Sequence, residues 1–231
     1  MPGPKLPSSW IVASAAQFAT VVALSSPVAA GTIWTDWTSA VPGDPGTASG
    51  TLNGIAISYA REVLTQTVTN GSFTGWAPAS SFQGGTVTTS PAAIGDMIAQ
   101  NGYRYAGPDT ITFAAPVVNP VIAIWSLGSS ATQASMRFNA TPTFEGGGPD
   151  SMYGGSRITL SGNVVSGKEG NGVVQFTGTF HSISWTETFE NYYGFTVGMA
   201  AATQVAEPAP LALLAVPFAL LCAIKRGKRA A

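Results

Sequence analysis

The stretch Ile55-Ala56-Ile57-Ser58-Tyr59-Ala60-Arg61-Glu62-Val63-Leu64 decides the fold class of this chain. Large apolar side chains recur on one parity, at Ile55, Ile57, Tyr59 and Val63. Successive side chains of a β-strand point to opposite faces, so a period of two predicts a half-buried strand. The pattern fits one strand, or two with a break near Arg61.

Further short segments along the chain are also predicted to be β-strands. They are Thr110–Ala114, Pro120–Leu127, Ala134–Asn139, Arg157–Ser161, Val173–Phe180, Ser182–Thr186 and Tyr193–Met199. Clusters of Gly, Asn and Pro separate these segments and indicate turns. Among these segments, the only expected helix is a turn or two at Pro91–Gln100, with Ser90 as its cap. The sequence therefore predicts an all-β domain, an antiparallel β-sandwich or jelly roll.

The composition of the predicted domain bears on its location and partners. Charged residues make up 9% of the chain, against about 25% in a typical soluble domain. Residues 31–205 hold ten acids against five scattered bases. Nucleic-acid binding needs clustered Lys and Arg, so no nucleic-acid partner is expected. The sole cysteine, Cys222, lies outside this range, so the domain is expected to fold without a disulfide and to offer no thiol nucleophile.

The N-terminal residues have the order of a secretory signal. Lys5 precedes an uncharged run from Trp10 to Leu24, and small residues follow up to Ala30. This order predicts a signal peptide over residues 1–30 that is cleaved after Ala30. The alternative is a retained membrane anchor, but polar residues dilute the apolar run.

The C-terminal residues form an apolar run, Leu211–Ile224, followed by the bases Lys225, Arg226, Lys228 and Arg229. As a helix the run spans about 21 Å, less than a hydrocarbon core of about 30 Å. The bases would stay on the cytoplasmic side and leave the preceding domain outside. We expect a temporary stop-transfer signal, with an ordinary single-pass anchor as the alternative.

The segment Val205-Ala206-Glu207-Pro208-Ala209-Pro210-Leu211-Ala212-Leu213-Leu214 and its basic end resemble the PEP-CTERM sorting signal of Gram-negative bacteria, also catalogued as an ice-binding protein C-terminal domain. The resemblance implies recognition by an exosortase, a membrane-embedded cysteine transpeptidase that cuts at the motif. The family motif is usually Pro-Glu-Pro, so Ala206 departs from it while Glu207 and Pro208 match. The expected sorting motif is therefore Ala206, Glu207 and Pro208.

Short segments of the predicted domain are similar to secreted PEP-CTERM β-sandwich domains of unassigned function, among them Trp34-Thr35-Asp36-Trp37 and Tyr193-Gly194-Phe195-Thr196-Val197-Gly198. The resemblance implies a signal peptide at 1–30, a β-sandwich at 31–205 and a sorting tail at 206–231. It also implies a protein that is held transiently in the inner membrane and then reaches the cell surface or the extracellular matrix. It assigns no catalytic residue.

Two features of the sequence are candidate catalytic centres. The sole histidine, His181, lacks both a nucleophile motif and a second zinc ligand, so a structural or surface role is expected. Glu187 and Glu190 form the densest acid pair and keep a secreted glycan-active enzyme as an alternative, because glycosidases need two carboxylates flanking the sugar. The expectation for this pair is nevertheless a solvated loop and a non-catalytic domain.

The segment Glu145-Gly146-Gly147-Gly148-Pro149-Asp150 offers two carboxylates and several carbonyl oxygens, which suit Ca²⁺. It matches no known calcium-binding loop, and the other aspartates, Asp36, Asp44, Asp96 and Asp109, are isolated in the sequence. A plain turn is expected here, with no metal site and no cofactor.

Aromatic side chains are the strongest candidates for ligand binding, because their flat apolar faces and polar edges suit sugar rings. Trp125 and Trp185 lie in apolar segments and are assigned to the core. The tyrosines next to Gly or Asn in predicted loops are candidate ligand contacts, namely Tyr103, Tyr153, Tyr192 and Tyr193. The expected activity is binding of an extracellular polysaccharide. Ice binding is a third alternative, but ice-binding faces usually need regular threonine arrays, whereas Thr86, Thr88 and Thr89 form only an isolated cluster.

Overall fold

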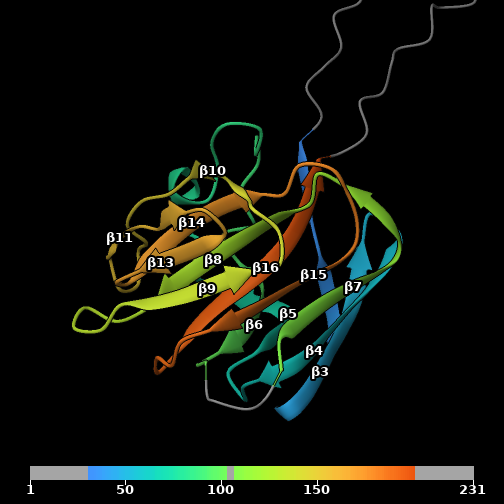
Figure 1. The fold of residues 1–231 in the computed structure, drawn as a ribbon, viewed down its shortest axis with the longest axis horizontal. Coiled ribbons are helices and arrows are strands. Elements are labelled where there is room, and N and C mark those ends of the chain that lie inside the picture. The colour runs from blue at the N-terminus through green and yellow to red at the C-terminus, as the bar shows by residue number, and fades with distance from the viewer. Residues whose placement is uncertain (1–30, 103–106, 201–231) are drawn as a thin grey trace, which may run out of the picture. The chain divides into compact units, whose positions relative to one another are not determined.

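The computed structural model describes residues 31–102 and 107–200, which form two stacked β-sheets (Figure 1). Sheet A has the order β10 (Thr143–Gly146), β14 (Gly170–Gln175), β8 (Val121–Leu127), β16 (Tyr193–Ala200), β6 (Gly95–Gln100) and β5 (Val68–Phe73). Two short strands extend it, β1 (Thr32–Trp34) beside β16 and β11 (Ser156–Arg157) beside β14. The predicted signal peptide, the sorting tail with its motif and basic cluster, and Tyr103 lie outside the described residues.

Sheet B has the order β12 (Thr159–Ser161), β13 (Val164–Gly167), β9 (Ala134–Phe138), β15 (Thr179–Glu187), β7 (Asp109–Val118), β4 (Ile55–Val63), β3 (Gly43–Leu52) and β2 (Asp36–Val41). The pairings within both sheets are antiparallel, except that β11 runs parallel to β14. The only helical element in the described ranges is the short 3₁₀ turn η1 (Ala79–Ser81). The prediction of an all-β, antiparallel sandwich is confirmed.

The strand predicted from the opening stretch is β4, and it continues through Arg61. At that point the pairing of β3 with β4 shifts register between Gly43 and Gly46, and Arg61 takes a φ of +136°. The predicted break is therefore a β-bulge. His181 also sits at a register shift, within the continuous strand β15, and its side chain is exposed.

The predicted helix at Pro91–Gln100 is wrong. Residues Gly95–Gln100 form β6, which pairs with β16 on one side and with β5 on the other. Met97 and Ile98 are both fully buried but belong to different apolar clusters, on opposite faces of sheet A. A short apolar segment cannot be assigned to helix or strand by its pattern alone, and here burial on both faces decides for the strand.

Sheet A packs on both of its faces. Ile122 and Ile124 of β8 contact the core between the two sheets, whereas Val121, Ala123 and Trp125 contact a second apolar cluster. Residues of the connection between β5 and β6, including Trp76, Phe82 and Val87, complete this second cluster. Trp185 belongs to the core between the sheets, so the assignment of Trp125 and Trp185 to the core is confirmed.

The middle of the outer face of sheet B carries a line of small hydroxyl side chains. One row of hydroxyls crosses five neighbouring strands in register, through Ser39, Ser49, Ser58, Thr112 and Ser182. Each of these residues is exposed. Neighbouring strands lie about 4.8 Å apart, so the row is regular in one direction. The sequence did not reveal this row, because its members come from five separate segments.

Candidate functional site

Tyr153 and Tyr192 come together over Trp125 at one end of the second apolar cluster. The ring centroid of Trp125 lies 5.4 Å from that of Tyr153 and 5.4 Å from that of Tyr192. Tyr153 is tilted by 35° and Tyr192 meets the indole edge-on at 77°. Trp125 is fully buried, whereas Tyr153 is 54% exposed. These three residues are called the aromatic face.

The loop that carries Tyr153 is fixed by Asp150 and Asn171. Asp150 Oδ1 accepts hydrogen bonds from the backbone amides of Met152 (2.6 Å) and Tyr153 (2.7 Å). Asn171 Nδ2 donates to Asp150 Oδ2 at 2.9 Å, and Asn171 Oδ1 accepts from the Ser126 amide at 2.8 Å. Asn171 is fully buried, so it ties this exposed loop to β8 and β14.

Glycine is required where this loop returns to the sheet. Gly154 and Gly155 have φ values of +75° and +69°, which other residues adopt only with strain. A Cβ atom at Gly155 would also clash with the carbonyl oxygen of Glu169. The Gly-Gly pair therefore lets the chain turn tightly behind Tyr153.

Tyr192 is positioned by the neighbouring Glu190. The Tyr192 amide donates to Glu190 Oε2 at 3.2 Å, and the Glu190 amide donates to the Asn101 carbonyl oxygen at 2.6 Å. Glu169 directly precedes β14, and its Oε2 accepts a hydrogen bond from Ser126 Oγ at 2.6 Å. Burial raises the pKa of Glu190, hydrogen bonds from its backbone neighbours lower it, and the charge of Glu169 raises it further. Two carboxylates thus border the aromatic face.

A second group of acids lies at an end of the core between the sheets. Glu62 from β4, Asp109 from β7 and Glu187 from β15 meet Tyr59 and Gln100 there; these five residues are called the carboxyl cluster. Asp109 Oδ1 accepts from the Tyr59 hydroxyl, from Gln100 Nε2 (2.9 Å) and from the Glu62 amide (3.2 Å). Gln100 Nε2 also lies 3.4 Å from both carboxylate oxygens of Glu187.

The carboxyl cluster holds a proton at neutral pH. Burial raises the pKa of Glu187 to about 10, and the charge and hydrogen bond of Asp109 add to this shift. Burial also raises the pKa of Asp109, while hydrogen bonds from Glu187 and Tyr59 oppose that shift. Glu187 is therefore the member of this pair that holds the proton, and it shares a hydrogen bond with Asp109.

The prediction of a solvated loop for Glu187 and Glu190 is wrong. Glu187 ends β15 inside the carboxyl cluster, and Glu190 is only 6% exposed beside the aromatic face. The two acids belong to different hydrogen-bond networks, because the turn between β15 and β16 passes from one side of sheet A to the other. The partner of Glu187 is Asp109, which the sequence left isolated; the pairing of Trp185 with Asp109 brings β15 and β7 together.

One of the tyrosines predicted to contact ligand is misplaced. Tyr193 is fully buried between the sheets, where burial raises its pKa well above the ordinary value. Tyr193 is the first residue of β16 and directly follows Tyr192, and successive residues of extended chain face opposite sides. Tyr153 and Tyr192 are brought together, Tyr193 is not, and Tyr103 lies outside the described residues.

The acids of the predicted turn at residues 145–150 have separate structural partners. Glu145 lies in β10 rather than in a turn, and its Oε2 accepts from the Thr86 amide (2.6 Å) and hydroxyl (2.9 Å). Asp150 holds the Tyr153 loop. Across residues 31–102 and 107–200, no group of three or more His, Cys, Asp or Glu side chains is arranged to hold a metal ion.

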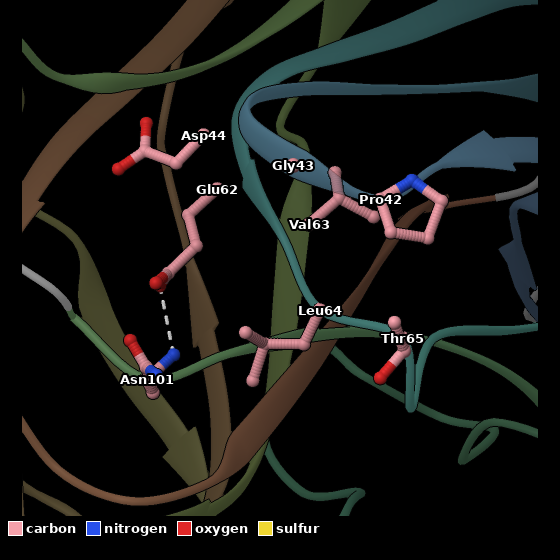
Figure 2. Close-up of a pocket in the computed structure, with 8 residues that line it drawn as sticks. All are labelled: Pro42, Gly43, Asp44, Glu62, Val63, Leu64, Thr65 and Asn101. Carbon is pink, nitrogen blue, oxygen red and sulfur yellow. Dashed lines mark hydrogen bonds between the residues drawn. The ribbon is translucent and has the colours of Figure 1, made fainter.

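An open pocket of about 440 Å³ lies beside the carboxyl cluster (Figure 2). It is lined by Pro42, Gly43, Asp44, Glu62, Val63, Leu64, Thr65 and Asn101. Figure 2 shows Glu62 turned toward Asn101, whose amide donates to Glu62 Oε2 at 2.8 Å. Asp44 forms an ion pair with Arg61, with 3.3 Å between Oδ1 and Nε. Both acids of the pocket therefore already have partners within the protein.

Comparison with known proteins adds no assignment. No family model, curated protein or solved structure matches the chain. In the part of the chain that the structure describes, none of the helices has the length and apolarity of a membrane span.

Proposed function

We propose that the β-sandwich is a non-catalytic carbohydrate-binding domain and that it binds sugar at the aromatic face. One observation carries this proposal: Tyr153 is half-exposed and packed on Trp125, and its loop is held by Asp150 and Asn171. A flat aromatic surface suits the apolar face of a sugar ring. A ring that is already held in place loses little conformational freedom on binding.

The full chain is screened on a glycan array, and the strongest ligand is then titrated by calorimetry. Tyr153→Ala and Tyr192→Ala are each expected to weaken binding by about three- to tenfold, because each removes about 0.5–1.5 kcal/mol of aromatic contact. Val118→Ala serves as the control, since Val118 is 55% exposed on β7 of the other sheet. Equal affinities for all three variants would place the binding site elsewhere.

We further propose that the protein is exported and sorted to the cell surface or extracellular matrix by an exosortase-type enzyme. The support is the pairing of the N-terminal signal pattern with the motif, apolar run and basic cluster of residues 206–231. Mass spectrometry of the native protein is expected to find an N-terminus near Gly31 and no basic tail. Recovery of an intact Lys225–Ala231 end from membranes would support a permanent anchor instead.

The sorting proposal is tested in a host that carries the exosortase. Changing Glu207 and Pro208 to Ala is expected to leave export intact but to trap the full-length protein in the inner membrane. Changing the four bases Lys225, Arg226, Lys228 and Arg229 to Ser is expected to let the chain pass through uncut. Normal processing of the Glu207→Ala, Pro208→Ala variant would contradict the proposed sorting signal.

A second candidate function is adsorption to a crystalline surface such as ice. The supporting observation is the hydroxyl row of sheet B, which is exposed, uncharged and regularly spaced across five strands. Inhibition of ice recrystallisation by the full chain, lost in Ser58→Lys and Thr112→Lys but kept in Tyr153→Ala, would favour this function over sugar binding. If the full chain does not inhibit ice recrystallisation, this second candidate function is excluded.

A further inference from the structure

We propose that the aromatic face takes uncharged, hydroxyl-rich glycans and rejects acidic ones, because Glu169 and Glu190 form an anionic rim beside the stacking ring. This inference rests on the proposed carbohydrate binding and specifies its ligand class.

The two acids are held at the aromatic face by separate contacts. Glu169 is fixed through the Ser126 hydroxyl, and Ser126 directly follows Trp125 in β8. Glu190 is fixed through the amide of Tyr192, whose ring touches Trp125. Each carboxylate is therefore tied to a residue that belongs to, or adjoins, the aromatic face.

The charge of this rim is not neutralised nearby. Within residues 31–102 and 107–200, neither Glu169 nor Glu190 forms an ion pair with Lys or Arg; the ion pair found there joins Arg61 to Asp44. The pKa of Glu190 is raised by burial and, to a smaller degree, by the charge of Glu169.

These features match the chemistry of neutral sugars. Glu169 is the more exposed of the two acids, and its carboxylate can accept a hydrogen bond from a sugar hydroxyl while the ring stacks on Tyr153. Glu190 is 6% exposed and contributes through its charge. A uronic acid or sulfated sugar would bring a second negative charge against the rim. Like charges placed opposite each other across an interface select strongly against the wrong partner.

The test compares neutral and acidic probes of equal length on the full chain. Mannohexaose and cellohexaose are the neutral probes and hexagalacturonate is the acidic probe, titrated by calorimetry at low ionic strength. We expect at least one neutral probe to bind tenfold or more tightly than hexagalacturonate. Added salt should narrow this difference, because it screens exposed charges.

Two variants assign the selectivity to the rim. Glu169→Gln and Glu190→Gln keep an acceptor oxygen for Ser126 and for the Tyr192 amide, and each is expected to raise the affinity for hexagalacturonate by threefold or more. Asp36→Asn is the matched control, because it removes an exposed acid from β2 of the other sheet. The fold of each variant is checked by its unfolding transition.

The outcomes separate the two proposals. Binding of hexagalacturonate as tight as that of the neutral probes, or no gain in the Glu→Gln variants, overturns the inference but leaves carbohydrate binding intact. If none of the three probes binds and the glycan array is also blank, the proposed function fails and the inference fails with it.

Discussion

The carboxyl cluster and the aromatic face are built from the same two residue types but in opposite surroundings. Tyr193 is fully buried between the sheets and Glu187 is half-buried in the carboxyl cluster, whereas Glu190 and Tyr192, a few positions away, lie at the aromatic face. The short turn between β15 and β16 connects the two regions. Side-chain direction along the chain, and not residue type, therefore decides which acid and which tyrosine join the carboxyl cluster and which border the aromatic face.

The carboxyl cluster and the aromatic face differ in how their acidic side chains are used. In the carboxyl cluster, burial and the charge of Asp109 raise the pKa of Glu187, so Glu187 keeps its proton and donates a hydrogen bond to Asp109. At the aromatic face, Glu169 and Glu190 accept hydrogen bonds from a hydroxyl and from backbone amides. Substitutions in the first region should change stability, and substitutions in the second should change binding.

Asp109→Ala is expected to have the largest effect on stability, about 3–5 kcal/mol, because it removes one member of a buried charge network. The Tyr59 hydroxyl, Gln100 Nε2 and the Glu62 amide would all lose the acceptor that they share. Chemical denaturation of the full chain measures this loss. A change below 1 kcal/mol would mean that water replaces Asp109 and that the cluster is not closed.

Glu187 should make the protein less stable as pH rises. Its folded pKa of about 10 lies above the ordinary value of 4.5, so between these values the folded state holds a proton that the unfolded state has released. The contribution of Glu187 to the free energy of unfolding is fully present below pH 4.5 and falls toward pH 10. The fall is about 1.4 kcal/mol per pH unit where the folded state holds one proton more than the unfolded state. Denaturation midpoints across pH 4–9 measure this slope.

Glu187→Gln imitates the protonated side chain and should flatten that slope, so that at pH 8 the variant is more stable than the native protein. Unchanged pH dependence would contradict a proton held by Glu187. The same variant tests the enzymatic alternative: release of reducing sugar by the native chain, lost in Glu187→Gln, would overturn the non-catalytic proposal.

Asn171→Ala should give an intermediate loss of about 1–3 kcal/mol, because it leaves buried hydrogen-bonding groups at Asp150 and at the Ser126 amide without a partner. It should also release the loop that holds Tyr153. Hydrogen exchange is expected to speed up at the amides of Met152 and Tyr153 while the amides of β4 stay protected. Faster exchange throughout both sheets would show instead that Asn171 supports the whole fold.

Tyr153→Ala should have the smallest effect on stability, within about 0.5 kcal/mol, since the residue is an exposed loop side chain. Its melting temperature should match that of the native chain while sugar binding weakens. A large loss of stability would show that Tyr153 has a structural role in packing on Trp125. The aromatic face would then affect stability as the carboxyl cluster does.

Local pattern was enough to predict much of the fold. The period of two at Ile55–Val63 marked β4, and the apolar run at Pro120–Leu127 marked a strand whose residues are all buried. It failed at Gly95–Gln100, where burial on both faces removes the alternation that distinguishes a strand. Tyr193, which was assigned to a loop, lies in the neighbouring strand β16 and is also fully buried.

The candidate site was predictable only in part. Tyr153 and Tyr192 were found because Gly and Asn neighbours mark loops, but nothing in the sequence placed either residue beside Trp125. The partnership of Asp109 with Glu187 depends on the register between β7 and β15. Long-range register of this kind is set by packing of the whole sheet, which a single sequence does not display.

The place of β16 in sheet A sets the order in which the protein can fold. It is the last strand in the described chain, yet it lies between β8 on one side and β6 and β1 on the other. If the chain leaves the cell N-terminus first, as proposed, the inner edges of β8 and β6 stay unpaired until residues 193–200 have crossed. The chain would then stay incompletely folded, and able to pass a narrow channel, until nearly all of it has crossed. Folding would be completed only as the sorting tail arrives at the membrane.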